Sequence, residues 1–75
     1  MADAPPSDLR CVFATKVRSR RGQLGISQEE LAERAGLHRT YVSQVERGVV
    51  NVSLDNIARL SAALQVEASE LFVRG

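Results

Sequence analysis

Apolar residues in the first third of the chain recur at the spacing of an α-helix. The positions that share one helical stripe are Leu9, Phe13, Val17 and Leu24. This stripe predicts a helix from residue 8 or 9 to about residue 24, with Asp8 as its N-cap and Gly25 at its end.

A second amphipathic segment follows Ser27. Ser27 and Glu30 fit a capping box, in which the serine accepts from a backbone amide and the glutamate returns to the cap amide. The apolar stripe behind this box predicts a helix over about residues 28–35 and consists of Leu31, Ala32 and Ala35. Gly36 then suits the left-handed conformation with which many helices end.

A third short helix is expected over about residues 39–47. Val42 and Val45 mark its inward side, His38 is its expected N-cap, and Gly48 stands at its end.

The last part of the chain predicts one more helix and a final turn. Ser53 is the expected cap of a helix whose apolar positions keep helical spacing: Leu54, Ile57, Ala58, Leu60 and Leu64. One or two turns over residues 68–72 follow, and no segment of the sequence shows the sustained two-residue alternation of a strand. The sequence therefore predicts an all-α domain of five helices over residues 8–73, after a flexible arm at residues 1–7.

Composition limits the class of protein. The 75 residues are 44% hydrophobic and 25% charged, which is typical of one globular domain. No apolar run approaches the roughly 18 residues of a membrane span, and no secretory signal is present, so we expect a cytoplasmic protein without a membrane partner. One cysteine and one histidine predict no disulfide, no metal site and no cofactor. The lone His38 and the small size also argue against an enzyme.

The net charge of +1 hides a basic segment. Residues 9–25 carry five basic residues and no acidic one. Such a cluster is typical of a surface that binds phosphate, and the alternative is a basic helix face exposed to solvent. Helical register makes Arg18 the expected phosphate contact, ahead of Lys16 and Arg20.

The segment 28–47 has the features of a helix-turn-helix. Ala32 is small where the two helices must cross, and Gly36 permits the turn between them. The second helix would present a face of side chains that hydrogen-bond to bases or phosphates: Arg39, Thr40, Tyr41, Ser43, Gln44 and Arg47. A solvated polar face is the alternative, but a face without Lys or Glu that includes a tyrosine favours contact with DNA.

Side-chain chemistry suggests individual roles on this face. Arg39 matches the O6 and N7 acceptors of guanine and Gln44 matches adenine, so these two are the expected base readers. The other expected base contacts are Thr40, Tyr41 and Ser43, for which contact with phosphates is the alternative.

Phosphate contacts are expected at both ends of the helix pair. Arg47 lies at the end of the second helix near Asn51, where both would meet the DNA backbone. Ser27 and Gln28 stand at the positive N-terminus of the helix over residues 28–35, where free amides favour an anion. The alternative for these two residues is capping alone.

Arg21 and Glu46 fall on apolar stripes, where each would be partly buried. Arg21 is four residues after Val17, and Glu46 is four residues after Val42. Because burial of one unpaired charge is costly, we expect the two side chains to form a structural ion pair.

Three motifs, GISQEELAERAG, YVSQVERG and NIARLSAAL, make the chain similar to the Cro/C1-type (XRE-like) helix-turn-helix family. The resemblance covers about residues 9–72 and implies a lambda-repressor-like domain. The small size, with LHRTYVSQVERG and NVSLDNIARL, most resembles the controller proteins of restriction-modification systems. It implies a bacterial or phage transcriptional regulator, associated with the nucleoid, that binds a double-stranded operator. A phage-type repressor, an antitoxin, and an adaptor that uses the same fold to bind proteins are the alternatives.

Two further partners are expected. A small core cannot cover all the apolar residues near the C-terminus, so we expect a symmetric homodimer, and hence a pseudo-palindromic operator, through Val66, Leu71, Phe72 and Val73. Phage-type activators that resemble this chain place acidic residues at the positions of Glu29 and Glu33, which implies contact with the sigma subunit of RNA polymerase. The alternative for these acids is a favourable interaction with the helix dipole.

Overall fold

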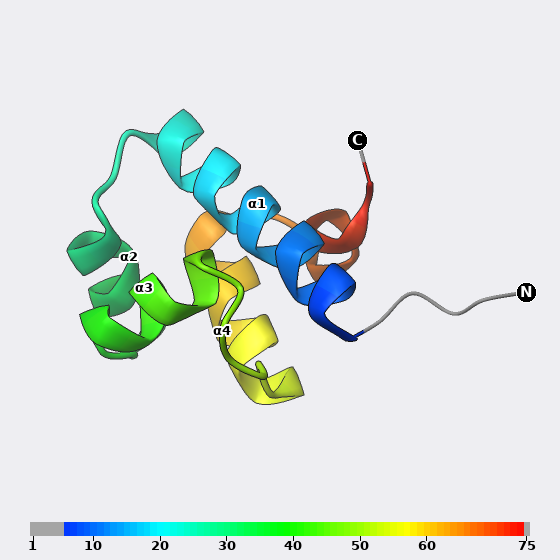
Figure 1. Cartoon of the computed structure of the whole chain (residues 1–75). Helices are drawn as coiled ribbons and strands as arrows, with labels where there is room; N and C mark the ends of the chain where they lie inside the picture. Colours follow the sequence, from blue (N-terminus) through cyan, green and yellow to red (C-terminus); the bar gives the residue numbers. More distant parts are fainter. Residues whose placement is uncertain (1–5, 75) are drawn as a thin grey trace, which may run out of the picture.

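Four α-helices and one 3-10 helix make up the part of the chain that the structure, a computed structural model, describes, residues 6–74 (Figure 1). The elements in order are α1 Pro6–Leu24, α2 Gln28–Ala35, α3 Arg39–Glu46, α4 Leu54–Leu64 and η1 Ala68–Phe72. Residues 6–74 contain no strand. The predicted all-α class is confirmed, and the fifth element is a 3-10 helix.

The start of α1 differs from the prediction. The helix begins at Pro6, so Asp8 lies in its first turn and the predicted N-cap was wrong. Proline suits a first helical position because its missing N–H would have no partner there. Asp8 pairs instead with Arg74. Residues 6 and 7 of the predicted arm are therefore helical, and residues 1–5 lie outside the described part of the chain.

Serine caps fix the starts of α2 and α4. The Ser27 hydroxyl accepts from the Glu30 amide at 3.0 Å, and the Ser53 hydroxyl accepts from the Asn56 amide at 3.1 Å. The Glu30 carboxylate pairs with Arg34 at 2.9 Å, so only the serine half of the expected capping box is seen. His38 occupies the N-cap of α3 without a side-chain capping bond, and α3 ends at Glu46, one residue earlier than expected.

The core lies where α1 crosses the other elements. In Figure 1, α1 lies across the molecule, with α2 and α3 on one side and η1 beside its first turns. Fully buried side chains from four helices meet in the core: Val17, Leu31, Val42, Leu60 and Leu64. Phe13 stacks on Phe72 with ring centroids 5.0 Å apart, which joins α1 to η1.

Two large residues of the predicted apolar stripes are exposed, and so is the small Ala58. Leu9 is 49% exposed and Leu54 is 83% exposed. Both lie near a helix start, beyond the edge of the core that the helix middles cover. Over residues 6–74, no helix is long and apolar enough to cross a membrane.

Candidate nucleic-acid interface

The turn between α2 and α3 has the geometry of a helix-turn-helix. Gly36 adopts a φ of 70°, a left-handed conformation that glycine enters without a Cβ penalty. The Leu37 amide then donates to the Ala32 carbonyl at 2.8 Å, which closes the end of α2. Ala32 is buried at this crossing, as the sequence predicts. The turn therefore sets α3 against α2 and leaves Arg39 and Thr40 at its start exposed.

The outward side of α3 carries most of the predicted base readers. Arg39 and Thr40 are exposed, and Ser43 and Gln44 are half-buried. Tyr41 differs, because it packs against the core and its hydroxyl accepts from Asn56 Nδ2 at 3.1 Å. Its side chain therefore contacts α4, which the sequence analysis missed.

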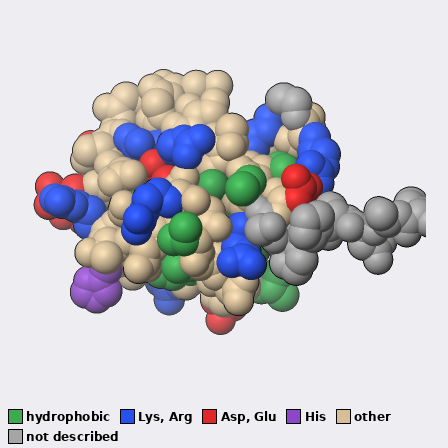
Figure 2. All heavy atoms as spheres, in the orientation of Figure 1, with side chains coloured by type: hydrophobic (Ala, Val, Ile, Leu, Met, Phe, Trp, Pro, Cys, Tyr) green, Lys and Arg blue, Asp and Glu red, His purple; other side chains and the backbone are tan. Residues whose placement is uncertain are grey.

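Lys and Arg atoms form several groups on the face that contains α1 and α3 (Figure 2). Arg47, at the C-cap of α3, is exposed, and so is Asn51 in the following loop. The histidine stands at the edge of this face (Figure 2). The expected phosphate contacts at the end of α3 are thus open to solvent.

A buried carboxylate holds α3 in place. Glu46 is 1% exposed and accepts from Arg21 Nε at 2.7 Å and from Arg21 Nη2 at 3.0 Å. This hydrogen-bonded contact with Glu46 raises the pKa of Arg21, and the Coulombic attraction adds to the rise against the opposing effect of desolvation. The sequence predicts this ion pair between α1 and α3, and the structure contains it.

Gln28 joins the same cluster from α2. Its Nε2 donates to Glu46 Oε1 at 3.0 Å, so one carboxylate connects three helices. The Gln28 side chain, which is predicted to bind phosphate, therefore already donates one hydrogen bond within the protein. The helix N-terminus beside it, capped by Ser27, is where the predicted phosphate contact would form.

Most arginines in the basic segment of α1 donate hydrogen bonds to other elements of the fold. Arg18 Nη1 donates to the Glu46 carbonyl at 2.7 Å, and Arg20 Nε donates to the Leu64 carbonyl at 2.8 Å. These carbonyls end α3 and α4, where cations interact favourably with the helix dipole. A phosphate contact of Arg18 stays a prediction, and neither helix-end contact could be predicted from the sequence because each joins residues far apart in the chain.

The predicted dimer residues have different environments. Leu71 is 2% exposed, so it belongs to the core of one chain and its assignment to an interface was wrong. Phe72 is half-buried against Phe13, and Val66 also packs against the core. Only Val73, 57% exposed, remains an open apolar side chain of this group.

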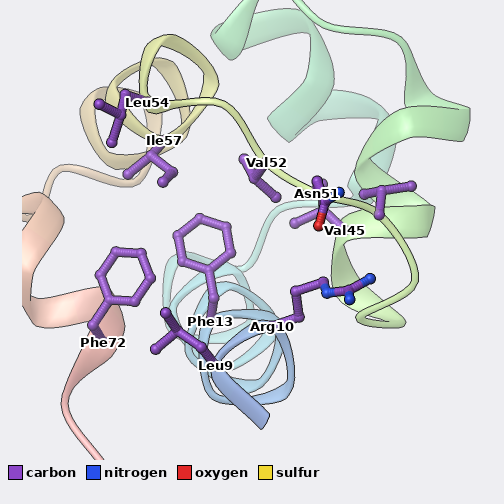
Figure 3. A pocket seen from close by; sticks show the side chains of 10 residues that line it. Leu9, Arg10, Phe13, Val45, Asn51, Val52, Leu54, Ile57 and Phe72 are labelled. Carbon is purple, nitrogen blue, oxygen red and sulfur yellow. The ribbon is translucent and has the colours of Figure 1, made fainter. Parts of the chain in front are cut away.

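An apolar groove of about 360 Å³ lies near η1 (Figure 3). It is lined by ten residues: Leu9, Arg10, Phe13, Val45, Val50, Asn51, Val52, Leu54, Ile57 and Phe72. Figure 3 shows Arg10 and Asn51 at one end and Leu54 with Ile57 at the other. Arg10 Nε is buried and has no hydrogen-bond partner within the described part of the chain. Two large apolar residues near helix starts, Leu9 and Leu54, were the available sequence signal for this groove.

The two acids predicted to contact polymerase are exposed on α2. Glu29 Oε2 lies 3.9 Å from Arg39 Nη1, next to the predicted base reader. Contact of Glu29 and Glu33 with RNA polymerase stays a prediction. No group of three or more His, Cys, Asp or Glu residues within the described chain could hold a metal ion.

Comparison with known proteins agrees with this geometry. The control protein C.BamHI of Bacillus amyloliquefaciens is 48% identical over 66 residues, which are 87% of this chain and 82% of that protein. The crystal structure of the restriction-modification controller protein C.AhdI from Aeromonas hydrophila has a TM-score of 0.82 at 49% identity, over 84% of this chain and 96% of that one. A hypothetical transcription factor from Neisseria has a TM-score of 0.85 at 49% identity, over 97% and 85% of the two chains.

The predicted resemblance to controller proteins is confirmed by these relatives. The sequence model of the helix-turn-helix family matches residues 17–71, which include α2, α3 and α4. The chain belongs to the helix-turn-helix family.

Proposed function

We propose that the protein is a sequence-specific transcriptional regulator of the restriction-modification controller type that binds double-stranded DNA as a dimer in the cytoplasm. The observation that carries this proposal is α3, which is clamped at its C-terminal end by Glu46 while Arg39 and Thr40 stay exposed. A rigid helix with exposed arginine and hydroxyl groups suits the major groove, where base edges can be read. The similarity to C.BamHI and C.AhdI supports the controller role.

Selection from random DNA duplexes tests sequence-specific binding directly. The wild-type protein should enrich a pseudo-palindromic sequence with half-sites about 10 base pairs apart and should bind it at least about 1,000-fold more tightly than random DNA. A protein-interaction adaptor with this fold would enrich no sequence over competitor DNA, and that result would contradict the proposal.

The partner in the dimer is a second copy that covers the apolar groove. A two-fold interface must be self-complementary, and this face carries both a hollow and a projecting apolar side chain, Leu54. Arg10 Nε at the groove has no acceptor among residues 6–74, and the exposed Asp55 beside Leu54 would provide a carboxylate from the second copy. Val73 is a further exposed apolar side chain, outside this groove.

Sedimentation equilibrium tests this interface. The wild type should sediment at twice the chain mass at micromolar concentration, and Leu54→Asp should sediment as a monomer because it would bury a charge. Val49→Asp is the matched control, since Val49 is 56% exposed but does not line the groove. A wild-type monomer, or a Leu54→Asp dimer, would show that this groove is not the interface.

A controller role also predicts regulation of a neighbouring promoter. Transcription in vitro from a promoter next to the selected operator should change on addition of the protein. Activation that is lost in Glu33→Lys, with operator binding intact, would favour the expected contact with RNA polymerase. Unchanged activation in Glu33→Lys would show that Glu33 does not contact RNA polymerase and is only an exposed acid of α2.

A further inference from the structure

We propose that Glu29 is a specificity-determining residue that acts through Arg39, restraining the guanidinium so that it favours a guanine edge over a phosphate. This inference rests on the proposed DNA-binding function. It assigns a purpose to the ion pair in which Glu29 Oε2 lies 3.9 Å from Arg39 Nη1, between the first turns of α2 and α3.

The surroundings of Arg39 make Glu29 the acid with the greatest effect on it. The first turn of α3 contains no acidic residue, so its own helix offers Arg39 no partner there. On α2, Glu30 is already paired with Arg34 at 2.9 Å. Both members of the Glu29 pair are open to solvent, with the Arg39 side chain 69% exposed and that of Glu29 77% exposed. The pair is therefore accessible to an arriving DNA duplex.

The two acceptors that DNA offers differ in charge. A guanine edge is neutral and accepts two hydrogen bonds, through O6 and N7. A guanidinium has five N–H donors, so Arg39 can bind guanine while it remains close to Glu29. A phosphate is an anion, and its approach to Arg39 also brings it close to the Glu29 carboxylate. Glu29 should therefore penalise phosphate binding by Arg39 and leave guanine binding nearly unaffected.

The size of the effect follows from the exposure of the pair. Ion pairs between exposed side chains change an equilibrium by no more than about fivefold, and salt reduces the change. Loss of the Glu29 charge should thus tighten binding to random DNA by about two- to fivefold at low salt. Binding to the selected operator should change by less than about 1.5-fold, because the guanine contact does not compete with the carboxylate.

The experiment measures the ratio of operator to random-DNA affinity for Glu29→Gln. The matched control is Glu33→Gln, which removes one charge from the same helix at an exposed position. A second comparison places Glu29→Gln in an Arg39→Ala background, because a double-mutant cycle isolates an effect that passes through Arg39. Thermal unfolding of each variant shows whether loss of a favourable charge near the N-terminus of α2 has altered the fold.

The expected result is a specificity ratio lowered about two- to fivefold by Glu29→Gln, unchanged by Glu33→Gln, and unaffected by Glu29→Gln once Arg39 is alanine. An equal loss of specificity in Glu29→Gln and Glu33→Gln, or a loss that persists without Arg39, would overturn the inference in favour of general repulsion. A wild type that prefers no sequence would instead overturn the proposed function, so the two failures are distinguishable.

Discussion

The arginines of α1 and those of α3 differ in what their guanidinium groups contact. Arg18, Arg20 and Arg21 of α1 donate to Glu46 or to the carbonyls at the ends of α3 and α4. Arg39 at the start of α3 and Arg47 at its C-cap are exposed, and Arg39 lies 3.9 Å from a carboxylate that is itself exposed. One residue type thus supports the fold in one helix and is available to a ligand in the other.

This difference shows that a run of basic residues does not by itself predict a phosphate-binding surface. The unpaired carbonyls at a helix C-terminus also attract cations, and α1 crosses two such ends. Variants can test whether the arginines of α1 stabilise the fold and those at the ends of α3 bind DNA. Each variant should change either stability or DNA binding and leave the other unchanged.

The largest effect is expected for Glu46, whose buried carboxylate accepts from Arg21 of α1. Glu46→Ala should lower the free energy of unfolding by about 3 to 5 kcal/mol, because it leaves Arg21 without its buried partner. Urea denaturation measures the loss. Glu30→Ala is the control, since its pair with Arg34 is exposed and should contribute about 0.5 kcal/mol or less. Similar losses in both variants would mean that Glu46 is no more important to the fold than a surface acid.

The next largest effect is expected for Arg39, the proposed reader of guanine. Arg39→Ala should weaken binding to the selected operator by about 1 to 3 kcal/mol and relax the preference at one base pair, with little change in stability. Fluorescence anisotropy with operator and random duplexes separates the two affinities. Equal losses on both duplexes would place Arg39 among the phosphate contacts.

Smaller effects are expected for Arg20 and Arg47, which should differ in whether their loss changes stability or DNA binding. Arg20→Ala should reduce stability by about 1.5 kcal/mol, because the Leu64 carbonyl loses a charged donor. Arg47→Ala should leave stability nearly unchanged and reduce the salt dependence of DNA binding by about one unit of slope. If Arg20→Ala altered the salt slope instead, the division between the two helices would be wrong.

The smallest expected effect concerns the two serine caps. Ser27→Ala and Ser53→Ala should each destabilise the protein by about 1 kcal/mol, because each removes one acceptor at a helix start. Only Ser27→Ala should also weaken DNA binding, since only Ser27 stands at the proposed phosphate site. Equal DNA affinities for the two variants would reduce Ser27 to a cap.

Local sequence patterns predicted the elements that depend on neighbouring residues. Ser27, Gly36 and Ser53 act within a few positions of themselves, and all three have the predicted conformation or bond. The contact of Arg21 with Glu46 was also predictable, because two misplaced charges on apolar stripes need each other. The DNA-binding function could be predicted from the sequence because the residues of a helix-turn-helix motif lie close together along the chain.

The errors concern surfaces that only the packed molecule defines. Leu71 looked available for a partner but is covered within the chain, whereas Leu54 looked like core and is exposed. An apolar stripe indicates which side of a helix faces the core. It does not indicate where the neighbouring helix ends, and an apolar residue beyond that point is exposed. The contacts of Arg18 and Arg20 span 28 and 44 positions, and no local pattern indicates such pairings.

The stacking of Phe13 on Phe72 has a consequence for how the protein is made. These rings come from the first helix and the last turn, and the ion pair of Asp8 with Arg74 joins residues 66 positions apart. Closing so long a loop costs entropy before any contact repays it, so this junction should form late in folding. During translation, α1 can be covered on that side only after the ribosome has added residue 72. During synthesis α1 can therefore pack fully only after η1 has been made.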